Sequence, residues 1–421
     1  MRVALVGWVV LAACSDVYYP LRDAYVPDAP FGPVTVSLGV PSPGVRVYFQ
    51  DRPRDPPSLV TTGSDGRATG NVHAGGLVTV INPYGTANGL EARTFSGLSP
   101  GDVLTLAPTP EGVLGGPQIK VQVPSDPTSN GIYQLRAPCG HFGSPPRILA
   151  DYVELTYTLE GCDAITDLVV WTEVPGPTLH RSISASNVAI VDQAVIDLTS
   201  ESYVDPTTLT INTSGVPPAM YAGPSAALHT DKGSLYDTIG APVFVPPATT
   251  EIALPGFPGA FARVEMLVYI GSERHILVKD SAPSATLGFS VDASMLSQLE
   301  GCPVYSLATG EVTWNESSNG QVADLVAALV VVERASATWT WSVIGPTGHP
   351  LMIPALGPSA LFDIREGDAI RFGDFYRARV PGGYASVLGS VMPPTSSLYA
   401  DLRARDGAVL ANASGPPAGC L

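Results

Sequence analysis

Apolar and polar positions alternate along most of the chain. The clearest runs are residues 152–159 (YVELTYTL) and 337–343 (ATWTWSV), where every second side chain is apolar. Since successive side chains of a strand point to opposite faces, a period of two predicts strands with one buried face. Gly, Pro, Asn and Asp separate such runs, as is typical of sandwiches and barrels. The pattern predicts an all-β protein built from two or three consecutive antiparallel β-sandwich domains.

Helices are expected to be few, because the chain contains 41 prolines and proline interrupts helices. Residues 293–300 can form two helical turns. Residues 321–334 fit either a helix or a strand, and the run of valines before the next alternating segment favours the strand. Beyond the N-terminus, no apolar run approaches the roughly 18 residues of a membrane-spanning helix.

The first fourteen residues resemble a bacterial lipoprotein signal. Arg2 precedes the apolar run VALVGWVVLAA, which ends at Cys14. A basic start followed by a short apolar stretch is typical of a secretory signal, and the stretch is too short to cross a bilayer. Leu-Ala-Ala-Cys resembles the lipobox, which implies cleavage after residue 13 and acylation of Cys14. An ordinary signal peptide or a buried N-terminal strand is the alternative. Ser15, in place of an aspartate, favours the outer membrane.

The remaining cysteines are even in number, as expected of disulfides in an oxidising compartment. They are Cys139, Cys162, Cys302 and Cys420. Four cysteines allow three pairings, of which we favour Cys139–Cys162, because these two are close in sequence and flanked by strand-like segments. That choice leaves Cys302–Cys420. A metal site is the competing interpretation, but the sequence has no Cys-x-x-Cys pair and no nearby group of histidines.

The distribution of proline-rich stretches and strand-like runs divides the chain into five predicted segments. Residues 1–13 are the signal peptide, residues 14–32 a lipidated tether rich in proline, residues 33–113 a first domain, residues 114–247 a second and residues 248–421 a third. The proline-rich stretch 243–250 serves as the expected linker between the last two domains.

The first domain resembles the carboxypeptidase-regulatory-like family. The segments that carry the resemblance are GVRVY at 44–48, TTGSDGRA at 61–68 and GGLVTV at 75–80. In this family a Thr-x-x-Asp-Gly turn connects strands, and Asp65-Gly66 fills that turn here, because glycine accepts a positive φ. Gly63 and Ala68 depart from the usual acidic and aromatic residues. The resemblance implies a transthyretin-like sandwich with a spacer or binding role, and the later domains are expected to be sandwiches of Ig-like or transthyretin-like type.

The net charge and the motifs of the sequence argue against several classes of function. The chain of 421 residues carries a formal charge of −16, which argues against nucleic-acid binding. It contains no Gly-x-Ser-x-Gly, no His-Glu-x-x-His and no phosphate-binding glycine-rich motif. We therefore expect no catalytic residues, no cofactor and no bound metal.

Three short segments contain residue types that are common in catalytic or ligand-binding sites. Residues 229–234 (HTDKGS) predict a polar turn, since a triad is assembled by the fold and not by adjacency. Residues 272–275 (SERH) predict a solvated hairpin tip. Trp339 and Trp341 would share one face of a strand, where they could stack on a ligand, although packing in a core is the favoured interpretation.

These observations predict a lipid-anchored protein of the bacterial cell envelope, held in the outer membrane through Cys14 and facing the periplasm or the cell surface. Its role would be structural, adhesive or ligand-binding, with an envelope protein or a glycan as partner. The alternatives are a surface lipoprotein that binds or hydrolyses polysaccharide, and a subunit of a larger surface assembly.

Overall fold

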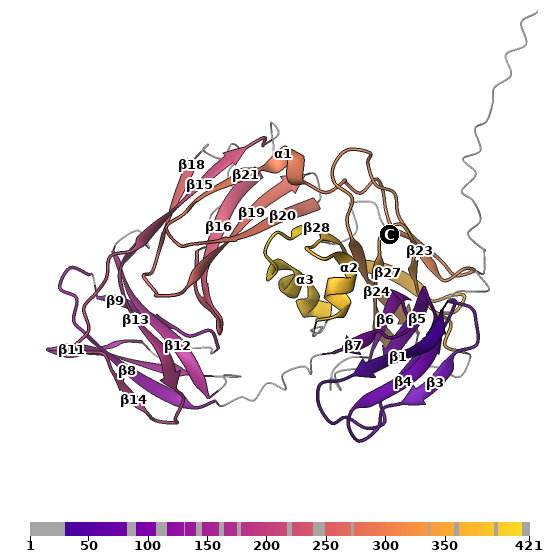
Figure 1. Ribbon diagram of the computed structural model, residues 1–421, viewed down its shortest axis with the longest axis horizontal. Coiled ribbons are helices and arrows are strands. Elements are labelled where there is room, and N and C mark those ends of the chain that lie inside the picture. Colours follow the sequence, from indigo (N-terminus) through magenta and orange to yellow (C-terminus); the bar gives the residue numbers. More distant parts are fainter. Residues whose placement is uncertain are drawn as a thin grey trace, which may run out of the picture.

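A computed structural model of the chain confirms the all-β class (Figure 1). The structure describes residues 30–81, 90–106, 116–129, 131–139, 145–159, 164–174, 178–216, 221–238, 249–270, 273–335, 337–357, 362–390 and 395–414. Within these ranges no helix is long and apolar enough to cross a bilayer. Residues 1–29, including Cys14, lie outside the described residues, so the signal peptide and its lipidation stay predictions.

The N-terminal sandwich consists of two facing sheets. One sheet has the order β4-β1-β7, and the other contributes β6-β5-β2-β3. The bounds are β1 Phe31–Ser37, β2 Arg46–Gln50, β3 Ser58–Thr61, β4 Arg67–His73, β5 Gly76–Ile81, β6 Leu90–Leu98 and β7 Val103–Thr105. The first strand begins two residues before the predicted start of this domain.

The Asp65-Gly66 turn lies between β3 and β4, as the sequence predicts, but it does not close a hairpin. Gly66 has a φ of +72°, and a Cβ added there would lie 2.2 Å from the Val40 carbonyl oxygen. Glycine is therefore required on both counts. Because β3 and β4 belong to different sheets, the turn carries the chain across the sandwich.

The second sandwich packs a β10-β11-β8-β14 sheet against a β13-β12-β9 sheet. The bounds are β8 Gln118–Pro124, β9 Ile132–Arg136, β10 Arg147–Ile148, β11 Tyr152–Thr158, β12 Ile165–Val174, β13 Thr178–Ala189 and β14 Val195–Asp197. Its core is self-contained, since all the buried residues of that cluster lie between Ile119 and Ile183.

The rest of the chain forms further layers around one long sheet. The remaining strands are β15 Thr207–Ser214, β16 Tyr221–Thr230, β17 Gly233–Thr238, β18 Thr249–Leu254, β19 Phe261–Ile270, β20 Glu273–Ser281, β21 Thr286–Ser290, β22 Val304–Ser306, β23 Glu311–Thr313, β24 Leu325–Arg334, β25 Ala337–Pro346, β26 Leu351–Met352, β27 Ala369–Arg379 and β28 Val409–Ser414. The helices are α1 Val291–Ser294, α2 Gly383–Leu388 and α3 Thr395–Arg403.

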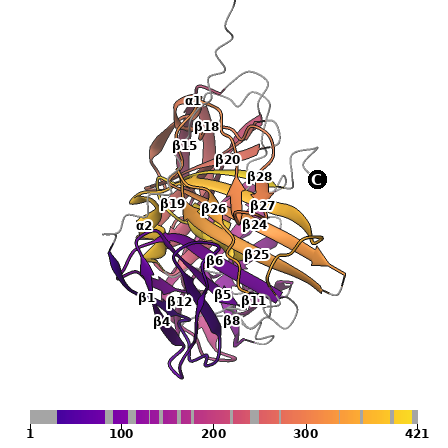
Figure 2. The same ribbon diagram turned by 90° about the vertical axis from the view of Figure 1, so that its right-hand side faces the viewer.

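A twelve-stranded sheet runs through the molecule in the order β17-β16-β19-β20-β28-β27-β24-β25-β6-β5-β2-β3 (Figure 2). One of its faces is covered by β4-β1-β7 together with α2 and α3, around a core that includes Phe95, Ile276 and Leu402. The opposite face is covered by the β18-β15-β21 sheet at one end and the small β22-β23-β26 sheet further along. The long sheet therefore belongs to several cores at once.

Strand pairing joins the predicted third domain to both of the earlier ones. Strand β6 of the first predicted domain pairs in parallel with β25 of the third, with Trp341 opposite Ala92. Likewise β16, assigned to the second domain, pairs with β19 of the third. Residues 249 and 250 of the predicted linker belong to β18, which pairs with β15 of the predicted second domain, and residues 243–248 lie outside the described residues.

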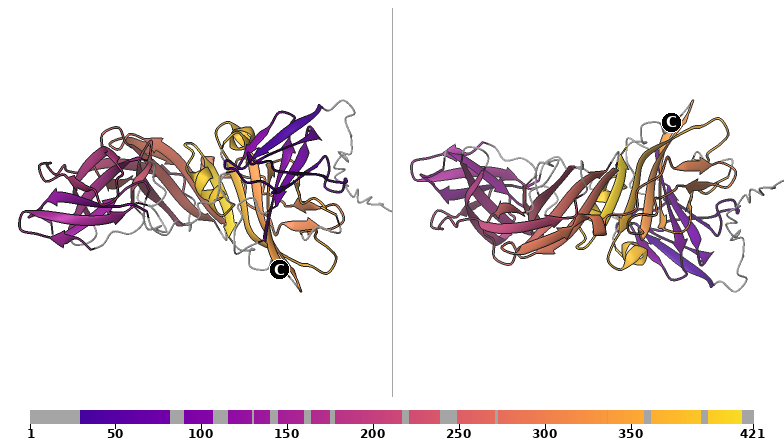
Figure 3. Two further views of the ribbon diagram at one scale, coloured as in Figure 1. Left: turned by 90° about the horizontal axis from the view of Figure 1, so that it is seen from below. Right: turned by 90° about the horizontal axis from the view of Figure 1, so that it is seen from above.

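The protein is elongated (Figure 3), and in the view of Figure 1 its sheets follow an arc. The second sandwich occupies one end and the N-terminal sandwich the other, while α2 and α3 lie on the inner side of the curve (Figure 1). Neither α2 nor α3 is predicted by the sequence pattern, and the helix expected at 293–300 is reduced to the single turn α1. The strand interpretation of residues 321–334 is confirmed by β24.

Candidate functional site

The inner side of the arc contains a hollow of about 490 Å³ between the long sheet and α3. Gly223, Ser225 and Ala227 of β16 form its floor. These three residues alternate with Ala222 and Ala226, whose side chains point into the core on the other face of the sheet. Because the floor residues are small, the longer side chains of β19, β20 and α3 can stand around an open space.

Four of the charged groups around the hollow are arranged in two ion pairs. Arg403 of α3 holds Glu265 of β19 with both ends of its guanidinium, Nε donating at 3.0 Å to Oε1. Arg263 binds Asp280 in the same two-pronged way, at 2.8 and 2.7 Å. A bidentate pair restricts the conformations of both side chains. The ion pairs therefore hold the walls of the hollow in a fixed geometry.

A third carboxylate, Asp237 of β17, lies 2.5 Å from Nη1 of Arg136 in the second sandwich. This contact joins the second sandwich to the edge of the long sheet. Lys232, in the turn between β16 and β17, makes a similar bridge to Asp167 at 2.7 Å. The second sandwich is thus held against the hollow by two ion pairs.

His229 also lines the hollow and stacks on Phe261, with ring centroids 5.5 Å apart. Burial lowers the pKa of the His229 ring, and the nearby charge of Arg263 lowers it further. The ring is therefore neutral at pH 7, and its nitrogens offer one donor and one acceptor.

Arg274 of β20 also lines the hollow, and it contacts Tyr399 of α3. The guanidinium carbons of Arg274 and Arg403 lie 6.0 and 5.8 Å from the centre of the Tyr399 ring, so two cations contact one aromatic ring. Cations are attracted to the face of a tyrosine. Burial raises the pKa of Tyr399 to about 12, so its hydroxyl keeps its proton.

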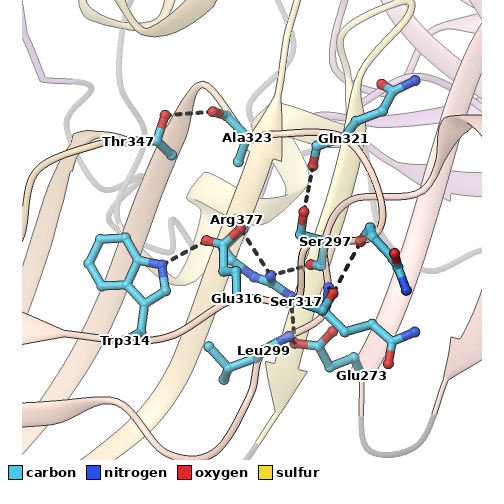
Figure 4. A network of polar contacts seen from close by, with 12 residues as sticks. Glu273, Ser297, Leu299, Trp314, Glu316, Ser317, Gln321, Ala323, Thr347 and Arg377 are labelled. Atoms are coloured by element: carbon cyan, nitrogen blue, oxygen red, sulfur yellow. Dashed lines mark hydrogen bonds and ion pairs between the residues drawn. The ribbon is translucent and has the colours of Figure 1, made fainter. Parts of the chain in front are cut away.

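The opposite face of β20, together with β27, carries a closed network of charges (Figure 4). Arg377 of β27 lies 2.5 Å from Glu273 of β20 and 3.6 Å from Glu316. His275 lies 3.2 Å from the second oxygen of Glu273. Backbone groups also take part in the network: Arg377 donates a hydrogen bond to the Ser297 carbonyl, and the Leu299 amide donates one to Glu273.

Two alanines make this network possible. Strand β28 separates β20 from β27, and Ala411 lies opposite both His275 and Arg377 in the strand register. Ala413 lies in the same way between Glu273 and Phe375. Because a methyl group leaves room above the middle strand, long side chains from the outer strands meet over it. Burial by itself would raise the pKa of Glu273, but the His275 hydrogen bond and the Arg377 charge outweigh it and hold that pKa below its ordinary value.

Residues 273–275 are therefore part of β20 and not a solvated hairpin tip, so the prediction is wrong for them, while residue 272 lies outside the described residues. Glu273 is 5% exposed and His275 is fully buried. They alternate with Arg274, which points to the hollow on the other face. Sequence reasoning missed the site because three polar residues in a row suggest an exposed turn, although their partners lie on β27, β28 and α3.

The other candidate residues have mixed outcomes. Trp339 and Trp341 are 1% and 0% exposed, which confirms core packing and rules out ligand stacking by this pair; Trp341 donates to Thr94 at 2.9 Å. Within residues 229–234, Asp231 and Lys232 form the turn between β16 and β17, and the other four residues belong to those strands. Cys139 and Cys302 are both disulfide-bonded, but Cys162 and Cys420 lie outside the described residues, so the pairing stays a prediction.

Comparison with known proteins adds little. No family model and no curated protein matches the sequence. Among solved structures, the Bacillus anthracis TIE protein aligns over 62% of this chain and 50% of its own, with 8% identity and a TM-score of 0.15. A likeness at that TM-score carries no argument about fold or function.

Proposed function

We propose that this protein is a lipid-anchored component of the bacterial outer membrane with a non-catalytic, ligand-binding role. The observation that carries the binding role is the hollow on the inner side of the arc. It is the meeting point of the long sheet, α3 and the second sandwich, and ion pairs hold its walls in place. Pre-organised concave sites of this kind are typical of ligand-binding proteins.

The charges of the hollow support binding over catalysis. Glu265 is held by Arg403 and Asp237 by Arg136, so each carboxylate already has a cationic partner. The same pairs keep the geometry of the wall constant, which favours a site that recognises a ligand without changing it.

The arc also fits an anchored protein. The N-terminal sandwich, from which the proposed tether would lead to Cys14, lies at one end, and the second sandwich lies at the other (Figure 3). An anchor at the first end would hold the hollow and the second sandwich away from the membrane surface. Several acyl chains on one cysteine give stable membrane attachment.

Metabolic labelling with a clickable fatty acid tests the anchor. The full chain is expressed in a bacterium, and we expect label on the protein and its recovery in the outer-membrane fraction. Cys14→Ser serves as the matched variant and should lose the label and leave the membrane fraction. Labelling that persists in Cys14→Ser, or wild-type protein without label, would overturn the anchor. Protease treatment of intact cells then shows which side of the membrane the hollow faces.

A further inference from the structure

The second sandwich has a core of its own, and polar groups connect it to the rest of the protein. The buried residues of that core all lie between Ile119 and Ile183. Contacts that cross to the neighbouring strands include two ion pairs, a hydrogen bond from the Gly256 amide to the Ser182 hydroxyl and the ring contact of Trp171 with Tyr236. A polar interface between two units of one chain permits relative motion unless specific contacts oppose it.

The chain that leaves the second sandwich also permits such motion. Residues 198–206 lead from β14 to β15, and Val204 forms a backbone bridge with Ser182 of β13. The segment therefore belongs to the second sandwich as far as Val204, and only residues 205 and 206 separate it from β15. The other connection, through residues 107–115, lies outside the described residues. Two residues between packed units are enough to act as a hinge.

The most specific of the crossing contacts is made by Lys232, in the turn between β16 and β17. Its Nζ donates to Oδ1 of Asp167 and to Oδ1 of Asn187, at 2.7 Å in both cases. The Asn187 amide donates to the same Asp167 oxygen at 2.9 Å, and the Thr230 side chain adds a further hydrogen bond to Asp167. We call these four residues the docking contact, with Lys232 and Thr230 on the long sheet and Asp167 and Asn187 on the second sandwich.

The backbone of the second sandwich is irregular at both of its residues in the docking contact. The pairing of β12 with β13 shifts register between Thr166 and Leu168, at Asp167 itself, and a bulge redirects the side chain that it contains. Asn187 of β13 has a φ of +55°, a left-handed conformation that asparagine adopts more readily than most residues. These two features place both acceptor oxygens within reach of one amine.

Burial distinguishes the docking contact from the other ion pair of the interface. Asp167 is 2% exposed. Burial by itself would raise its pKa, but hydrogen bonds from Lys232, the Asn187 amide and Thr230 outweigh it and hold that pKa below its ordinary value. A buried carboxylate that loses its cation is strongly destabilising. The side chains of Arg136 and Asp237 are 41% and 40% exposed, and an exposed pair contributes little.

We propose that the docking contact fixes the orientation of the second sandwich, with Lys232 as the residue on which it depends. Without Lys232 the sandwich keeps its own fold but turns about residues 205 and 206. Lys232 and Thr230 then give a role to the polar turn that the sequence shows at 229–234. This inference concerns the shape of the molecule and depends neither on ligand binding in the hollow nor on the lipid anchor.

Single-molecule FRET on the full chain tests the proposal. The dyes are attached through non-natural amino acids at Val195 of β14 and Val304 of β22, which are 54% and 60% exposed. We expect one narrow distribution of transfer efficiency for the wild type. Lys232→Met removes the amine but keeps the length of the side chain, and it should broaden and shift the distribution, because the docking contact opens.

Lys279→Met is the matched control. Lys279 of β20 donates to the Gly288 carbonyl at 2.6 Å, so the substitution removes a bonded lysine without touching the docking contact and should leave the distribution unchanged. Asp167→Asn should broaden it as Lys232→Met does. The two substitutions together should broaden it no further, because both remove the same contact. Arg136→Gln should have a smaller effect.

A distribution in Lys232→Met as narrow as that of the wild type would overturn the proposal, as would equal broadening in Lys279→Met. A larger effect of Arg136→Gln than of Lys232→Met would assign the role to the other ion pair and would also overturn it. Urea denaturation shows whether each variant is folded. If Asp167→Asn unfolds the second sandwich, Lys232→Met still decides the question, because Lys232 lies outside the core of that sandwich.

Discussion

The two faces of β20 carry charged groups of the same kinds in opposite arrangements. On one face Arg377, Glu273 and His275 are buried and contact one another, and backbone groups add further hydrogen bonds. On the other face Arg274 lies at the edge of a hollow, and no carboxylate of the described residues forms an ion pair with it. The charges of the first arrangement are paired within the protein, whereas Arg274 is a cation without a carboxylate partner in that part of the chain. The pairing of charges, more than their number, distinguishes the two faces.

The largest effect is expected from opening the closed network. Arg377→Met keeps the length of the side chain but leaves Glu273 buried without its cation, which should lower the free energy of unfolding by about 3–5 kcal/mol. Urea denaturation measures it. Adding Glu273→Gln to the same chain should restore part of the loss, because the uncompensated charge is then gone. A loss below about 1 kcal/mol would place the network among ordinary surface contacts.

A smaller effect is expected from filling the gap over the middle strand. Ala411→Leu puts a branched side chain between His275 and Arg377 and should cost about 1–3 kcal/mol through overpacking. Ala369→Leu, at an exposed position of β27, is the matched control and should be close to neutral. Equal stability of the two variants in urea would show that room above β28 is not what lets the network form.

Acid should weaken the closed network. The pKa of Glu273 is lower in the folded protein than its ordinary value, so its contribution to stability is present above the ordinary glutamate pKa, about 4.3. That contribution is lost as pH falls through the folded pKa. The wild type should therefore lose more stability than Glu273→Gln as pH is lowered below about 4.5. Thermal unfolding across this range compares them, and parallel curves would argue against the assignment.

The smallest change in stability is expected in the hollow. Arg274→Gln removes a charge that no carboxylate of the described residues holds, so unfolding should change by no more than about 0.5 kcal/mol. The same urea experiment as for Arg377→Met gives a direct comparison. A loss as large as that of Arg377→Met would make Arg274 a structural residue and erase the distinction between the two faces.

Local patterns predict local structure well in this chain. The alternation at 152–159 became β11, and the tryptophans at 339 and 341 are buried as the same pattern suggests. Burial of Glu273 and His275 could not be predicted in this way, since it depends on β28, more than a hundred residues later, having alanines at 411 and 413. The separation of the predicted first and third domains is wrong for a related reason: the partner of β6 is β25 and not a neighbour along the chain.

That pairing of β6 with β25 constrains the order in which the protein can be completed. During synthesis β6 leaves the ribosome long before residues 337–346, and until they arrive its outer edge has unpaired amide and carbonyl groups. An exposed strand edge is a template for aggregation, and pairing across such a separation is slow to form. The N-terminal sandwich is therefore synthesised first, but its sheet is among the last to complete its strand pairing. Until then its exposed edge would need protection by a chaperone.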